Sequence, residues 1–262
     1  MRKIAIAALL MGLVTLSAIA QNQSRPWSEW CKKDAEKMLN DSPWAQVQVE
    51  TNASEMIYSP TTGSAPSLST TPMTRPPATI REEQADRNAR RGTEGAYNGP
   101  VNTSYQIRFL SAKPIREAFA NLILLQQSGS SAEDQQKIKK QMQEFVDRNY
   151  GDFVVVTVSY TSSDGRLTGK AFQNFNSAVT NTLKNNTYLE RTDGKRVYLI
   201  DYRAPIDDGL GAKFVFPRNF EDKPFLTAAS NEVRFCAEMG TNLKLNRRFK
   251  VSDMIFQGKL EY

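Results

Sequence analysis

Residues 232–251, EVRFCAEMGTNLKLNRRFKV, are the stretch that best predicts the fold class. Val233, Phe235 and Ala237 alternate with polar residues, and the residues after Gly240 alternate in the same way. This alternation is typical of strands with one buried face. A short connection between two such strands makes them antiparallel neighbours. The stretch therefore predicts an antiparallel strand pair.

The same period of two extends back to residue 188. The dipeptides Asp193-Gly194 and Asp208-Gly209 supply turns between the expected strands. These strands cover residues 197–200, 213–216, 232–239 and 243–251, and residues 254–256 with Leu260 are expected to close the sheet. The second half of the chain thus reads as an antiparallel meander.

The first half is mainly helical. Apolar residues at helical spacing predict helices at 26–40, 115–123, 138–146 and 167–183. Strands are expected at 44–50, 105–109 and 153–160. The last of these is the most apolar and should lie at the centre of a sheet. The expected fold is α+β, a mainly antiparallel sheet with three to four helices mostly in the N-terminal half.

The beginning of the chain has the three parts of a secretory signal peptide. Arg2 and Lys3 precede an apolar run that ends near Leu16, and Ala18 and Ala20 form a small-residue cleavage signature. The run is short for a transmembrane helix, and no other stretch is apolar enough to cross a bilayer. We expect residues 1–20 to be removed and the protein to work in the periplasm or outside the cell.

Composition divides the remaining chain into three parts. Residues 21–50 should form a helix and strand that pack on the core, and residues 103–262 should form the α+β core itself. Residues 51–102 are rich in Ser, Thr and Pro, so they are expected to be a flexible insertion. The formal net charge of +6 is scattered and has no accompanying motif, so nucleic-acid binding is not expected.

The chain has no histidine, which excludes Ser-His-Asp and Cys-His catalysis and histidine-bound zinc. No phosphate-binding or dinucleotide-binding glycine motif occurs, so neither a metal nor a cofactor is expected. Asp201, Asp207 and Asp208 are candidates for hydrolysis by two carboxylates. In the alternative interpretation, residues 207–209 form a turn and Asp201 pairs with Arg203.

Two further residue groups invite a role. Trp27, Trp30 and Trp44 are candidates for binding a partner or carbohydrate, or they anchor the first helix in the core. Cys31 and Cys236 are the only cysteines, and in an exported protein such a pair suggests a disulfide. A helix carrying Cys31 would then cover the polar face of the strand that carries Cys236. Two separate thiols are the alternative.

Three stretches carry a family resemblance. They are WSEWCKKDAEKMLNDSPW at 27–44, SAKPIREA at 111–118 and FKVSDMIFQGKLE at 249–261. Together they are similar to uncharacterised exported proteins of acidobacterial-type bacteria. The resemblance implies a signal peptide and a bacterial envelope or secreted setting, and it carries no known chemistry.

These observations predict an exported, non-enzymatic domain that binds an envelope or extracellular partner or contributes structure. One alternative is a carboxylate-dependent hydrolase of polysaccharide or cell wall. A second alternative is a carrier of a small apolar ligand, with the sheet curved around a pocket.

Overall fold

The computed structural model describes residues 25–52, 101–127, 129, 131–162, 165–240 and 243–262. The predicted signal peptide and most of the predicted insertion lie outside these ranges. The chain separates into two units, Met1–Val49 with Thr103–Tyr262 and Glu50–Asn102. The first unit contains nearly all of the described residues.

The helices follow the apolar spacing of the sequence but are more interrupted than expected. In chain order they are η1 Trp27–Glu29, α2 Lys32–Asn40, α4 Lys113–Gln126, α5 Ala132–Val146, α6 Gly165–Ser177, α7 Thr180–Leu183 and η3 Val251–Asp253. The predicted helix at 26–40 breaks because Trp30 and Cys31 have extended backbones. The predicted helix at 167–183 breaks before α7, where Val179 is extended. No helix in the described ranges is both long enough and apolar enough for a membrane span.

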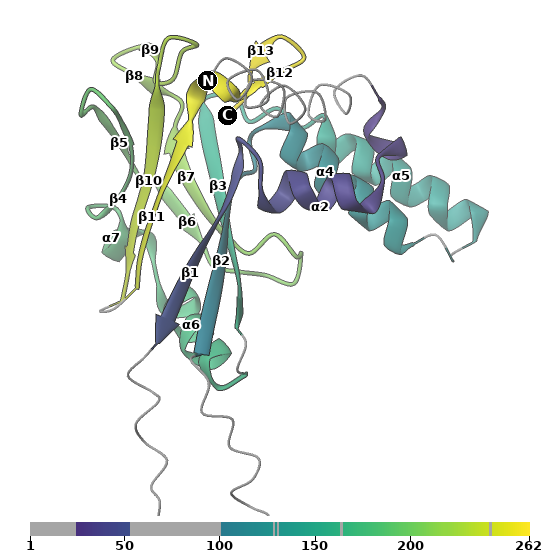
Figure 1. Cartoon of the computed structure of the whole chain (residues 1–262), viewed down its shortest axis with the longest axis horizontal. Coiled ribbons are helices and arrows are strands. Elements are labelled where there is room, and N and C mark those ends of the chain that lie inside the picture. The colour runs from purple at the N-terminus through teal and green to yellow at the C-terminus, as the bar shows by residue number, and fades with distance from the viewer. Residues whose placement is uncertain (1–24, 53–100, 128, 130, 163–164, 241–242) are drawn as a thin grey trace, which may run out of the picture. The chain divides into compact units, whose positions relative to one another are not determined.

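Two main sheets confirm the predicted α+β class with antiparallel pairing (Figure 1). The five-stranded sheet has the order β1 Ala45–Asn52, β2 Val101–Phe109, β3 Phe153–Ser162, β7 Ala212–Pro217 and β6 Asp201–Arg203. The four-stranded sheet has the order β11 Leu243–Lys250, β10 Glu232–Met239, β4 Thr187–Arg191 and β5 Arg196–Tyr198. The apolar strand β3 is central, as predicted.

The second half of the chain does not form one continuous meander. The chain passes from β5 to β6 and changes sheet: the Leu199 amide donates to the Thr187 carbonyl (3.0 Å), and the Ile200 amide donates to the Val215 carbonyl (2.9 Å). Residues 254–260 do not close a main sheet either. They form a separate hairpin, β12 Ile255–Phe256 with β13 Lys259–Leu260, and β8 Asn219–Phe220 pairs with β9 Lys223–Pro224 in another.

A side chain links the two sheets at the edges formed by β1 and β11, which lie away from the β5–β6 connection. On β1, the Gln48 amide nitrogen donates to the Lys244 carbonyl (2.7 Å), and its oxygen accepts from the Asn246 amide (2.8 Å). These bonds satisfy backbone groups on the outer edge of β11, which would otherwise be open for pairing. The sheets are therefore connected at one edge by the chain and at the other by Gln48.

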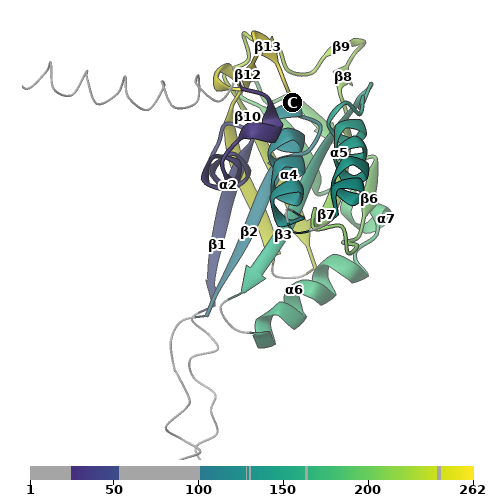
Figure 2. The same ribbon diagram turned by 90° about the vertical axis from the view of Figure 1, so that its right-hand side faces the viewer.

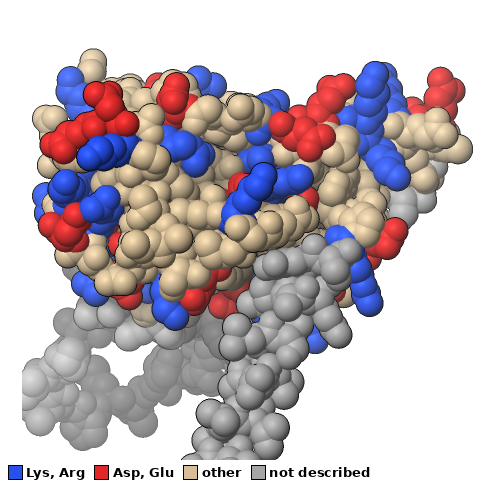
Figure 3. All heavy atoms as spheres, turned by 90° about the horizontal axis from the view of Figure 1, so that it is seen from above, with Lys and Arg blue, Asp and Glu red and all other residues tan. Residues whose placement is uncertain are grey.

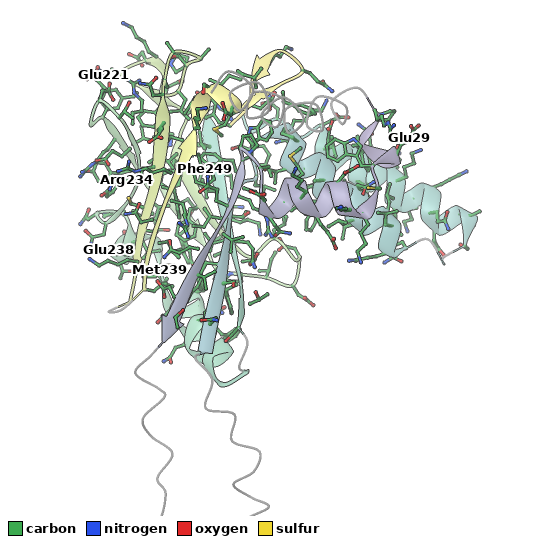
Figure 4. All side chains as sticks on the ribbon, in the orientation of Figure 1. Glu29, Glu221, Arg234, Glu238, Met239 and Phe249 are labelled. Carbon is green, nitrogen blue, oxygen red and sulfur yellow. The ribbon has the colours of Figure 1, made fainter. Side chains whose placement is uncertain are left out.

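Aromatic side chains fill the space between the sheets. Phe109 packs on Phe249 with ring centroids 4.9 Å apart, and Phe235 packs on Phe214 and Phe216 at 5.5 and 6.2 Å. Phe249 lies on the inner side of the four-stranded sheet, whereas Arg234 lies on the outer side (Figure 4). The space between the sheets is therefore a packed core.

Helices cover part of the outer face of the five-stranded sheet. Figure 2 shows α4 and α5 side by side in front of the sheet, with α2 next to α4. The Arg108 Nε on β2 donates to the Leu39 carbonyl of α2 (2.6 Å). The buried Asn121 of α4 donates to the carbonyls of Trp27 and Trp30 at 2.8 and 3.1 Å. This helical layer forms one wall of the candidate site.

Candidate functional site

An open cavity of about 820 Å³ lies between the α4–α5 pair and the outer face of the five-stranded sheet. Its walls are largely apolar. Phe119 comes from α4 and Met142 and Phe145 from α5, while Phe153, Val155 and Val215 come from the sheet; Ile200, Ala204, Ile206 and Leu210 come from the segments beside β6. We call this cavity the groove.

Strand alternation explains the sheet side of the groove. Val155 of β3 pairs with Val215 of β7, and Val215 pairs with Asp201 of β6. The next pair of residues on the same outer face is Lys213 of β7 and Arg203 of β6. Successive residues of a strand point to opposite faces, so the strands that place Phe214 and Phe216 in the core place these side chains toward the helices.

Three large apolar side chains of the groove are open to solvent. The exposed fractions are 46% for Phe153, 46% for Ile200 and 67% for Ile206. They come from three different segments of the chain and line the same cavity. Exposed apolar side chains that gather in a hollow, rather than lying singly on the surface, are typical of a binding site.

The charged residues of the groove are mostly paired. The Asp201 carboxylate accepts from the Arg203 Nε (3.0 Å), and the Asp208 carboxylate contacts the Lys213 Nζ (2.6 Å). Asp208 also accepts from the Leu210 amide (3.0 Å), which is the turn chemistry of the alternative interpretation. Asp207 lies exposed in the same turn and does not line the groove. The two carboxylates that do line it are each held against a cation.

The three tryptophans lie in the interior. Trp27, Trp30 and Trp44 are each at most 8% exposed. The Trp27 indole donates to the Gln143 side chain (3.3 Å), and the Trp44 indole donates to the Glu261 carbonyl (2.7 Å). These rings attach the N-terminal segment to α5 and to the C-terminal end, so their faces contribute to packing.

The predicted disulfide between Cys31 and Cys236 is not formed, and both thiols are free. Cys31 is exposed at the start of α2, which packs on α4 on the helical side. Cys236 is buried in β10 opposite Tyr188, and this burial raises the pKa of its thiol. The expectation failed because α2 covers the outer face of the other sheet, away from the strand that carries Cys236.

A second, polar cavity of about 420 Å³ adjoins the groove. Arg148, Asn149 and Tyr150, which follow α5, line both cavities. Arg116 and Arg218 also line the polar cavity. The Arg116 guanidinium donates to the carbonyls of Leu110, Ser111 and Val146, and that of Arg218 donates to those of Gly151, Phe153 and Tyr262. Backbone oxygens thus fix these two arginines.

A buried glutamate next to Arg116 predicts a pH-dependent stability. Burial raises the pKa of Glu117 to about 7, and the positive charge of Lys113, whose Nζ lies 3.8 Å from the carboxylate, opposes this rise only in part. The unfolded value is about 4.3, so the folded state binds the extra proton between these values. Stability should therefore fall as the pH rises from about 4.5 to about 7.5.

Glu117→Gln is expected to remove this loss and to exceed the wild type by up to about 3 kcal/mol at pH 8. Urea unfolding at pH 5 and pH 8 measures the effect. Glu144→Gln, which changes an exposed glutamate of α5, is the control and should follow the wild type. A Glu117→Gln variant with the pH dependence of the wild type would contradict the assignment.

Neither a cluster of metal ligands nor a similar protein points to a particular activity for the groove. Among the described residues, no group of three or more His, Cys, Asp or Glu side chains is placed to hold a metal ion. No family model, curated protein or solved structure matches the chain. On the face seen in Figure 3, acidic and basic side chains are interspersed. The groove is therefore the feature from which we infer a function.

Proposed function

We propose that this protein is an exported, non-enzymatic binding protein that holds an apolar small molecule in the groove. The observation that carries the proposal is the gathering of exposed Phe153, Ile200 and Ile206 in a cavity of about 820 Å³. The signal peptide predicted at residues 1–20 supports a role in the periplasm or outside the cell. The proposal combines the expectation of a non-enzymatic exported binding protein with the alternative of a carrier for a small apolar ligand.

Size and lining both favour a small-molecule ligand. Pockets for small molecules usually have volumes of about 300–1,000 Å³, and they combine apolar walls with a few polar groups. Burying apolar surface contributes about 25 cal/mol per Å², so a ligand that covers the three exposed side chains gains affinity from them. Aromatic side chains pack the space between the sheets, which supports a binding site outside the sheets rather than within them.

The charges of the groove favour binding over hydrolysis. A two-carboxylate hydrolase needs one carboxyl group as an acid and another as a base or nucleophile. In the groove, Asp201 and Asp208 are both in contact with cations, and Asp208 also accepts a backbone amide. These contacts are those of structural carboxylates.

A neutral apolar dye tests the proposal. N-phenyl-1-naphthylamine should bind the purified protein saturably, with an increase in fluorescence. Phe153→Ser and Ile206→Ser should each weaken binding about tenfold or more, because a buried large apolar side chain contributes about 1.5–3 kcal/mol. Phe172→Ser is the matched control: Phe172 is 59% exposed on α6 and does not line the groove.

The affinity of the control should equal that of the wild type. The proposal fails if the dye does not bind saturably, or if Phe172→Ser weakens binding as much as Phe153→Ser does. Circular dichroism of each variant separates a local loss of affinity from a loss of folded protein.

A further inference from the structure

We infer that the natural ligand is a single-chain anionic amphiphile, whose apolar chain lies in the groove and whose carboxylate is held by Arg148. This inference rests on the proposed function and adds the chemical class of the ligand. Two observations carry it: an apolar cavity and a polar one share three lining residues, and the charged residues near these shared residues have a particular distribution.

The first observation is geometric. The groove has mainly apolar walls, and the cavity next to it has mainly polar walls. Residues 148–150 belong to both linings. A ligand that fills the groove and extends past these residues passes from an apolar environment to a polar one. An amphiphile has the same division within one molecule.

The second observation is the state of the cations. Arg203 and Lys213 in the groove each contact an aspartate. Arg148 instead lies over the Phe145 ring, 5.9 Å from its centroid. In the described part of the chain, Arg148 forms no ion pair with an Asp or Glu side chain within 4 Å.

The acids of the polar cavity have other partners. Asp147 accepts from the Gln143 side chain (2.7 Å), and Glu261 accepts from the Lys113 amide (3.1 Å). Three arginines and two acids line this cavity, so its lining side chains carry one excess positive charge. A cleft with an excess of one sign concentrates ligands of the opposite sign, and a single charge matches a monocarboxylate.

Arg148 is the arginine best placed to meet the ligand. Arg116 and Arg218 already donate to three backbone carbonyls each. Arg148 is exposed and lines both cavities, so its guanidinium can form a bidentate pair with a carboxylate. The ring of Phe145 beneath it holds the guanidinium at the mouth of the groove.

Displacement of the neutral dye compares three ligands with the same chain: dodecanoate, 1-dodecanol and dodecyltrimethylammonium. Dodecanoate should bind at least tenfold more tightly than the alcohol, since hydrogen bonds to charged groups contribute more than neutral ones. The ammonium compound should bind most weakly. Added salt should reduce the advantage of the acid over the alcohol.

Substitutions at Arg148 separate the carboxylate contact from the groove. Arg148→Gln should lower the affinity for dodecanoate to that for 1-dodecanol and leave the alcohol unchanged. Arg148→Lys should retain part of the advantage because it keeps the charge but loses the bidentate geometry. Arg248→Gln, which removes an exposed cation on β11, is the control and should match the wild type.

The outcomes distinguish this inference from the proposed function. Equal affinity for acid and alcohol, or an acid advantage that survives Arg148→Gln, overturns the inference while the groove remains a binding site. If no ligand binds, both the inference and the proposed function fail. If the protein binds only vesicles that contain an anionic phospholipid, and not monomeric dodecanoate, the inference is also overturned.

Discussion

Gly211→Ala is expected to destabilise the protein by about 3–5 kcal/mol, because two penalties fall on one residue. Gly211 has a φ of +82°, a region that side chains with a Cβ rarely adopt. A Cβ there would also lie 2.7 Å from the Val158 carbonyl carbon and 2.9 Å from the Ser159 Cα. These are backbone atoms of the central strand β3, so they cannot move aside independently. Urea unfolding measures the loss.

Gly194→Ala is the matched control for this effect. Gly194 has nearly the same φ, +81°, but no atom lies within 4 Å of the position that its added methyl group would take. Only the backbone penalty of about 1 kcal/mol should remain. Equal losses for the two variants would show that the close approach to β3 does not matter. Gly211 connects the turn that carries Asp208 to β7, so the same contact also fixes one wall of the groove.

The strands were predictable because buried and exposed residues alternate along each strand, and this alternation is visible in the local sequence. Val233, Phe235 and Ala237 point inward whatever strand lies beside them, and the sequence records that pattern directly. The partners of short strands were not predictable. The change of sheet between β5 and β6 depends on the amide bonds of Leu199 and Ile200 to residues that lie 12 and 15 positions away in opposite directions.

The site was much less predictable than the fold. The turn role of Asp208 follows from the local Asp-Asp-Gly sequence. The groove, in contrast, combines α4, α5, the sheet and the segment around Ile206, and no local pattern reports that combination. One signal was available, since Ile206 is a large apolar residue next to a polar turn. The side chain of Arg148 carries no sequence signal, because its significance depends on which groups surround it in the folded chain.

The cysteine pair shows the same limit. The presence of only Cys31 and Cys236 raised the question of a disulfide, and the alternation around Cys236 predicted that it lies on the face of its strand opposite to Phe235, where it pairs with Tyr188. The side of the molecule on which α2 packs depends on its contacts with α4, which is distant in the sequence. Sequence spacing alone could not show that the helix with Cys31 lies against α4.

Phe235→Ala is expected to cost about 3–5 kcal/mol in the free energy of unfolding. Phe235 is fully buried on β10 and packs on Phe214 and Phe216 of β7, so it joins the two sheets at the centre of the core. Removing the ring leaves a cavity that two sheets fixed at both edges can collapse only in part. Urea denaturation with circular dichroism detection gives the loss as a lower midpoint.

Phe172→Ala provides the comparison, because Phe172 is an exposed phenylalanine on helix α6. Its truncation should change stability by no more than about 0.5 kcal/mol, since exposed substitutions leave no cavity and alanine is a good helix former. A small loss for Phe235→Ala would mean that the sheets do not share one core. If the transition stays cooperative and its midpoint is lower only in the Phe235 variant, the result supports a single core between the sheets. The groove lies on the outer face of one of these sheets, so its shape depends on that core.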